Sequence, residues 1–156
     1  MEIAFLKKNE INEFSEKVKE IILSTPYYSK IAKREEIKKY KVSELRKKLK
    51  DKDKIYLVAK TDNKIIGFLN GYFDCETFWV EWAGVEKNSR RKGIAINLNK
   101  FLENNLKKSN IHKIWCDCRT NNKESINLLK KLKFKKIALV KRHWYKHDFY
   151  LWYKFI

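Results

Sequence analysis

The chain has few of the residues that build metal centres, redox sites or many tight turns. Its 156 residues include four glycines, one proline and three cysteines, Cys75, Cys116 and Cys118. The last two are separated by one residue, which is the spacing of neither a redox motif nor a zinc pair, and no His/Cys cluster completes a site. We therefore expect no metal, and free, buried or incidental thiols in a reducing cytoplasm. On a strand, Cys116 and Cys118 would share one face.

Long apolar runs are also absent. No stretch approaches the roughly 20 apolar residues that a membrane-spanning helix needs. The N-terminal MEIAFLKKNEINEF carries charges from its second residue and lacks the apolar core of a signal peptide. The chain is 44% hydrophobic and 14% aromatic, which indicates a packed core despite 36% charged residues. We expect one domain covering residues 1–156, in the cytoplasm and with no membrane partner.

Acidic residues are scarce relative to basic ones. There are 19 Asp and Glu against 37 Lys and Arg, a formal net charge of +18. Such a field favours anionic partners: nucleic acid, acidic proteins or a phosphate-rich cofactor. Lysine is scattered along the expected helices, however, and such surfaces also reflect genome composition or a hot habitat. Charge alone does not identify the partner.

Apolar periodicity predicts an alternating order of strands and helices. Apolar residues between 11 and 22 recur at three- and four-residue spacing, which predicts a helix ending before Pro26. The rest of the pattern predicts one or two basic helices within 27–50, a helix from Gly93, a short helix at 125–132, and strands at 2–6, 55–59, 65–73, 78–85, 112–119, 134–142 and 147–155. The resulting order, β-α-α-β-β-β-α-β-α-β-β, predicts a mixed sheet with helices on its faces, a fold of the α/β or α+β class.

The stretch V-E-K-N-S-R-R-K-G-I-A (85–95) joins an expected strand to an expected helix. No glycine spacing matches a P-loop or a dinucleotide-binding fingerprint. At a helix start, however, the first N–H groups lack partners and the helix dipole is positive, which stabilises an anion. Gly93 would let the backbone approach a phosphate, and Arg90, Arg91 and Lys92 would add positive charge. The alternative is a solvated, charged helix start; the sequence favours a pyrophosphate site.

Two motifs resemble those of the GNAT superfamily of acetyl-CoA-dependent N-acetyltransferases. R-R-K-G-I-A (90–95) is similar to the family's R/Q-x-x-G-x-G/A motif. N-K-E-S-I-N-L-L-K-K-L-K-F (122–134) resembles its N-x-x-S/A-x-x-L-Y-E-K-x-G-F helix, and the strand order and the closing H-D-F-Y-L-W-Y-K extend the resemblance over nearly the whole chain. The resemblance implies a single-domain GNAT acyltransferase fold with a mostly antiparallel sheet. It also implies an enzyme that transfers an acetyl group from acetyl-CoA to a primary amine of a small molecule or protein.

The resemblance further implies where acetyl-CoA binds. Its pantetheine arm would pair with the strand around Ala83 and Val85 like an additional β-strand. Asn122 would cap the second motif's helix and lie close to the cofactor. The residues implied at the pyrophosphate are Arg90, Arg91, Lys92, Gly93, Ile94 and Ala95.

The acceptor amine must be neutral to attack, so a base or a water chain has to take a proton. Glu81 is the only carboxylate in F-W-V-E-W-A-G-V, and alternation gives it the same face as Ala83. Partial desolvation between two tryptophans would raise its pKa, as a base requires. The alternative is a strand glutamate paired with a neighbouring lysine.

The acid is less clear from the residues. Where the family often has a tyrosine that protonates the departing thiolate, this chain has Leu129, which cannot donate a proton. The donor would then be Tyr145 or His143, or solvent. A lysine, Lys133, also replaces the family's glycine before the phenylalanine.

The resemblance also implies that the acceptor lies between residues 26–50 and the loop around 141–148, segments that are basic and aromatic in this chain. They predict an acceptor bearing a carboxylate or phosphate, or an acidic protein segment. Two other functions stay open. One is a GNAT-fold module that binds CoA without turnover, in view of Leu129. The other is nucleic-acid binding through the +18 charge and stacking aromatics, which is less favoured because no RNP-like or zinc-finger pattern occurs.

Overall fold

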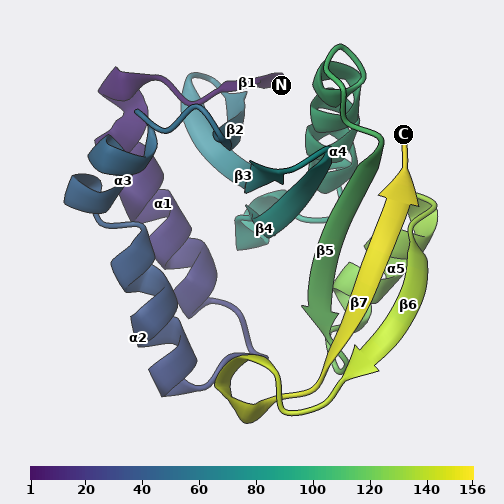
Figure 1. The fold of residues 1–156 in the computed structure, drawn as a ribbon. Coiled ribbons are helices and arrows are strands. Elements are labelled where there is room, and N and C mark those ends of the chain that lie inside the picture. The colour runs from purple at the N-terminus through teal and green to yellow at the C-terminus, as the bar shows by residue number, and fades with distance from the viewer.

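The computed structural model describes all 156 residues as one seven-stranded sheet with helices on both faces (Figure 1). The strands are β1 (Glu2–Phe5), β2 (Lys54–Thr61), β3 (Lys64–Asp74), β4 (Thr77–Val85), β5 (Lys113–Arg119), β6 (Lys135–Val140) and β7 (Phe149–Phe155). The helices are α1 (Ile11–Leu23), α2 (Lys30–Lys39), α3 (Val42–Lys48), α4 (Ile94–Leu106) and α5 (Lys123–Lys131), with single 3-10 turns η1 (Lys8–Glu10), η2 (Lys87–Ser89) and η3 (Trp144–Lys146). The predicted α/β class and the predicted strands are confirmed, and the basic segment 27–50 forms two helices.

The sheet has the order β1-β2-β3-β4-β5-β7-β6, and only the β4–β5 pair is parallel. This pair is short, because it joins Thr77–Val80 to Lys113–Cys116 and then ends. Beyond it the two strands diverge, as Figure 1 shows. The edge of β4 from Glu81 to Val85 therefore has no neighbouring strand on the side of β5.

Two apolar cores hold the sheet between the helices. On one face α1 and α3 bury Phe14, Val18 and Leu45 against β2 and β3. On the other face α4 and α5 pack on the sheet, and Leu98 and Leu102 of α4 are fully buried. Each such side chain contributes about 1.5–3 kcal/mol relative to an exposed one. β4 is held on both faces, because Phe78 belongs to one core and Trp82 packs against the other. No helix combines the length and apolarity that crossing a bilayer would require.

A β-bulge interrupts the pairing of β3 with β4. The register shifts between Asn70 and Gly71, and Glu81 is the only residue of β4 without a partner on β3. A Cβ added to Gly71 would lie 2.1 Å from a backbone oxygen of β4, so the close approach there requires glycine. Asn70 donates a hydrogen bond to Glu81. Ala83 instead pairs with Leu69, whose side chain belongs to the core on the face of α4 and α5. The expectation that Glu81 shares a face with Ala83 is therefore wrong, because the extra residue inverts the alternation.

The cysteines are placed as the sequence predicts. Cys116 and Cys118 are buried in the core under α4 and α5, and Cys75 is exposed. All three are free thiols. Burial raises the pKa of Cys118 to about 11, which keeps this thiol protonated and unreactive.

Candidate active site

The turn before α4 has the backbone conformation of an anion-binding loop. Arg91 and Gly93 both have positive φ angles, 66° and 78°, and Gly93 is the N-cap of α4. Gly93 has no side chain to cap the first amides of the helix, so these amides are available to a ligand. A Cβ added to Gly93 would meet no atom within 4 Å. Glycine is thus favoured there by its left-handed conformation and by the open approach to the backbone.

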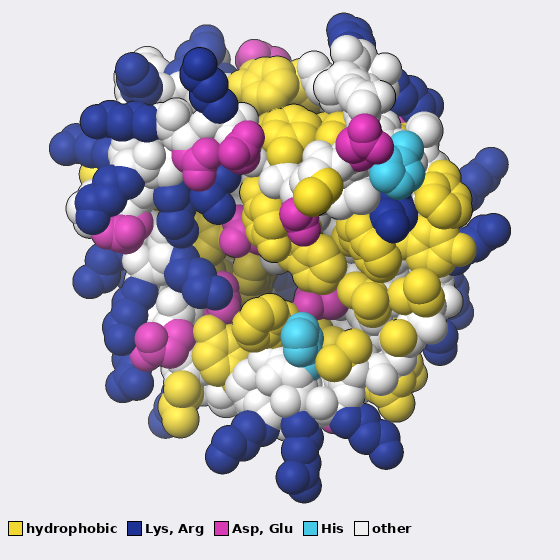
Figure 2. All heavy atoms as spheres, in the orientation of Figure 1, with side chains coloured by type: hydrophobic (Ala, Val, Ile, Leu, Met, Phe, Trp, Pro, Cys, Tyr) yellow, Lys and Arg dark blue, Asp and Glu magenta, His cyan; other side chains and the backbone are white.

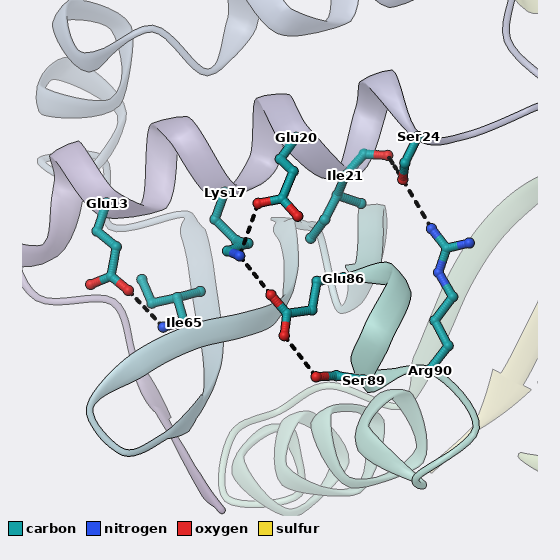
Figure 3. A network of polar contacts seen from close by, with 9 residues as sticks. All are labelled: Glu13, Lys17, Glu20, Ile21, Ser24, Ile65, Glu86, Ser89 and Arg90. Carbon is teal, nitrogen blue, oxygen red and sulfur yellow. Dashed lines mark hydrogen bonds and ion pairs between the residues drawn. The ribbon is translucent and has the colours of Figure 1, made fainter.

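Arg90 lies differently from the two cations that follow it. Its Nε donates to the carbonyl of Val85 at 3.0 Å. Its guanidinium also donates to Ser24 Oγ at 3.1 Å (Figure 3). These bonds tie the end of β4 to the end of α1. Arg91 and Lys92 are exposed, so they are the cations that are free to face a phosphate.

A second set of contacts in Figure 3 fixes the start of the same turn. Lys17 of α1 forms an ion pair with Glu86 at 2.6 Å, and Ser89 Oγ donates to the same carboxylate at 2.7 Å. Burial by itself would raise the pKa of Glu86, but the hydrogen bonds from Lys17 and Ser89 outweigh it and hold the pKa below its ordinary value. The charged pair thereby fixes the turn against α1.

Other residues implied for the cofactor lie on the edge of β4 and at the start of α5. The unpaired edge of β4 carries Ala83, which is exposed, and Val85, and it leads toward the turn before α4. Asn122 is the N-cap of α5, and its side chain accepts a hydrogen bond from the amide of Ser125 at 3.0 Å. Its capping role is confirmed, whereas its contact with a cofactor stays a prediction.

A cavity of about 190 Å³ opens on the face of β4 that carries α1, α2 and α3. Aromatic side chains form most of its wall, and three carboxylates from different elements line it: Glu36 of α2, Glu81 of β4 and Asp117 of β5. Two lysines, Lys39 and Lys48, complete its charged groups. Figure 2 shows acidic side chains around a central hollow with a hydrophobic rim, while Lys and Arg project mainly from the periphery.

Glu81 is oriented by a chain of hydrogen bonds. Asn70 Nδ2 donates to Glu81 Oε2 at 3.0 Å, and Tyr40 OH donates to Asn70 Oδ1 at 3.0 Å. Glu81 is exposed rather than enclosed by its flanking tryptophans, and it forms no ion pair with a lysine. Sequence reasoning missed Asn70, although a buried asparagine in the apolar strand I-I-G-F-L-N-G-Y-F was a signal.

The sequence also did not lead us to Asp117 and Glu36 as candidate site residues. Glu81 and Asp117 are the first residues after the last β4–β5 pair, so they flank the point where the strands diverge. Burial raises the pKa of Asp117; the hydrogen bond from Trp144 Nε1, at 2.9 Å, opposes this rise, and Glu36 adds to it. Glu36 is only 6% exposed and accepts hydrogen bonds from Tyr145 OH and Lys39 Nζ, both at 2.8 Å. A lone acid between the cysteines of the strand K-I-W-C-D-C-R was the available signal for Asp117.

Tyr145 lies in η3 and lines the cavity. Burial and its hydrogen bond to Glu36 raise its pKa above the ordinary value, so it is a weaker acid than a free tyrosine. Its role as proton donor stays a prediction. Leu129 is buried in the core of α4 and α5, so that position offers no donor. Of the C-terminal aromatics, Trp144 lines the cavity whereas Trp152 is a core residue.

Comparisons with solved structures support the fold. The chain superposes on the PaiA N-acetyltransferase of Thermoplasma acidophilum in complex with coenzyme A with a TM-score of 0.84, at 19% identity over 99% of this chain and 98% of that one. The ribosomal-protein-alanine N-acetyltransferase of Brucella melitensis gives 0.83 at 14% identity over 100% of both chains. A GNAT acetyltransferase of Streptococcus pneumoniae gives 0.82 at 19% identity over 99% and 98%.

A search of curated proteins finds no match. The model of the acetyltransferase (GNAT) family, in contrast, matches residues 16–134, which is more than half of the chain. This match covers the turn before α4, the free edge of β4 and the capped helix α5. The chain belongs to the acetyltransferase (GNAT) family.

Proposed function

We propose that the protein transfers the acetyl group of acetyl-CoA to a primary amine of a small molecule or a protein. One observation carries the proposal: the free edge of β4 runs between a helix start whose first amides have no side-chain cap and a cavity lined by carboxylates. An extended ligand with phosphates at one end and a reactive group at the other fits this line. Coenzyme A in the PaiA complex is such a ligand.

In this proposal the pyrophosphate binds the amides from Arg91 to Ala95. The positive φ angles of Arg91 and Gly93 present these amides, and the exposed cations supply charge. The pantetheine amides pair with the edge of β4 at Ala83 and Val85. Arg90 holds this edge in place through the carbonyl of Val85 rather than by contacting a phosphate.

Acetyl-CoA supplies an activated acyl group as a thioester, and the protein has to deliver a neutral amine to it. An amine with a pKa near 10 is mostly protonated at pH 7. Glu81 takes this proton, and Asn70 holds its carboxylate in one orientation. The aromatic wall of the cavity limits the access of water to the reacting groups.

The proton that the departing thiolate needs comes from solvent in this proposal. Tyr145 already donates a hydrogen bond to Glu36, and its raised pKa disfavours transfer of its proton to the thiolate. We therefore propose that Tyr145 orients the carboxylate of Glu36. Replacing it by phenylalanine should raise KM and leave kcat within about threefold. A large loss of kcat at unchanged KM would instead make Tyr145 the acid.

Cofactor binding is tested with two variants of nearly the same shape, Gly93→Asn and Gly93→Asp. Both residues tolerate positive φ, and the space beside Gly93 is open, so both variants should fold. The two differ only in charge. Titration calorimetry should show that Gly93→Asp weakens acetyl-CoA binding at least about tenfold more than Gly93→Asn. Equal affinities of the two variants would show that the phosphates do not bind at this turn.

Turnover is tested by CoA release with a panel of primary amines, using Glu81→Gln as the variant that should lose activity. Binding of acetyl-CoA without turnover of any amine would favour a CoA-binding module. Weak binding that disappears with salt and ignores Gly93 would favour a nucleic-acid-binding surface, because phosphate-backbone contacts are strongly salt-dependent.

A further inference from the structure

The carboxylates of the cavity have few cationic partners, although the chain has an excess of positive charge. The net charge is +18, yet the ion pairs give neither Glu81 nor Asp117 a Lys or Arg partner. His143 lies 3.6 Å from Asp117 and adds charge only when it is protonated. Glu36 is the exception, with Lys39 at 2.8 Å. These groups are consequently available to a positively charged ligand.

Glu36 and Asp117 are held in place by neighbouring residues of the same turn. Tyr145 donates to Glu36 and Trp144 donates to Asp117, so η3 fixes both carboxylates. The two are close enough for Glu36 to raise the pKa of Asp117. Keeping like charges together in a partly buried site is unfavourable, and a bound cation would relieve it. The structure has no group of three or more acidic, His or Cys side chains able to hold a metal ion, which favours an organic cation.

The wall of the cavity suits an organic cation. Tyr28, Trp79 and Trp82 line it, and aromatic faces attract ammonium groups by about 0.5–2 kcal/mol. Arg119 lies behind Tyr28, with its guanidinium 4.3 Å from the ring centre, and does not line the cavity. Lys39 is 53% exposed, so it can turn outward when a ligand cation replaces it at Glu36.

The charge of the lining indicates how many charges the acceptor carries. Three carboxylates and two lysines line the cavity, which gives the lining a formal net charge of −1. The proton that the amine loses stays on Glu81, so a monoamine compensates this charge while Lys39 stays at Glu36. When Lys39 turns outward, one lysine and three carboxylates remain, a formal charge of −2 that a dication balances. The small volume of the cavity, about 190 Å³, suits a short acceptor.

Building on the proposed function, we propose that the acceptor is a short organic dication. Its reacting amine lies at Glu81, and Glu36 and Asp117 hold a second, non-reacting positive group. This acceptor is opposite in charge to the anionic one that the basic segments 26–50 and 141–148 predict. Those segments carry their lysines mostly outward, whereas the carboxylates line the cavity. Glu36 and Asp117 therefore determine specificity, and Glu81 serves the reaction.

The test uses three four-carbon probes that differ only in the far group: 1,4-diaminobutane, butylamine and 4-aminobutanoate. Acetyl transfer to each is followed by CoA release. We expect kcat/KM for the diamine to exceed that for butylamine at least about tenfold, with 4-aminobutanoate the poorest. Glu36→Gln and Asp117→Asn keep the hydrogen-bonding shape of each side chain and remove its charge. Each should lower the diamine-to-butylamine ratio toward one, mainly through KM for the diamine.

The matched control is Glu16→Gln, the same change at an α1 side chain that is 75% exposed and does not line the cavity. It should leave the ratio unchanged. A wild-type ratio of one or below, or a ratio that Glu36→Gln and Asp117→Asn do not alter, overturns the dication proposal while leaving acetyl transfer intact. If no probe is acetylated, calorimetry of diaminobutane and butylamine in the presence of CoA decides: equal affinities overturn the proposal as well.

Discussion

Lys133 occupies a position in the backbone that strongly favours glycine. Its φ is 65°, and it directly follows the C-cap of α5. The amide of Phe134 bonds to the carbonyl of Leu129 at 2.9 Å, and that of Lys133 bonds to Lys130 at 3.0 Å. Together these bonds form a Schellman motif, in which this position is usually glycine. The GNAT motif has glycine at the same position. The left-handed backbone explains this preference, because a lysine is strained in that conformation.

Replacing Lys133 by glycine should stabilise the protein. A left-handed residue other than glycine costs about 1–2 kcal/mol. Glycine loses more chain entropy on folding, which offsets about 0.5–1 kcal/mol of this gain. Lys133 is exposed and forms no ion pair, so little else is lost. The free energy of unfolding should rise by about 0.5–1 kcal/mol and the Tm by roughly 1–4 °C.

The control is Lys130→Gly, the same change at an exposed helical residue of α5. There the backbone is right-handed, so glycine should lower the free energy of unfolding by about 1 kcal/mol. Urea denaturation of both variants gives the two values directly. The reasoning fails if Lys133→Gly destabilises the protein, or if the two variants change stability in the same direction.

Three further predictions concern the surroundings of the site. The pKa of Glu86 is lowered in the folded state, so its stabilising effect is present above its ordinary pKa of 4.5 and is lost as pH falls below it. Glu86→Gln weakens the pair with Lys17, so it should reduce the loss of unfolding free energy between pH 7 and pH 3 by about 1 kcal/mol, as measured by denaturation curves. Asn122→Ala should lower stability by about 1 kcal/mol in urea denaturation, because it removes the cap on the amide of Ser125. With a thiol reagent, Cys75 should react rapidly in the native protein, whereas the two buried cysteines of β5 should react only after unfolding.

Local patterns in the sequence determined much of the fold and of the cofactor side of the site. Apolar spacing placed the helices and strands, since each element has to present one apolar face to the core. The cations and the single glycine at 90–93 indicated the turn before α4, and Asn122 indicated the start of α5. These signals are readable because helix starts, caps and left-handed turns depend on a few consecutive residues.

The acceptor side was decided by tertiary structure. The bulge at Asn70 and Gly71 turned Glu81 to the other face, and no period-two pattern along β4 alone reveals a register shift set by its partner strand. Glu36 and Asp117 are far apart in the chain, and both line the cavity because β4 and β5 diverge and η3 bonds to both carboxylates. Net charge counts every lysine equally, whereas the fold decides which side chains face the solvent and which line a cavity. A chain with a net charge of +18 can therefore carry an acidic pocket, because specificity depends on the few groups that packing brings together.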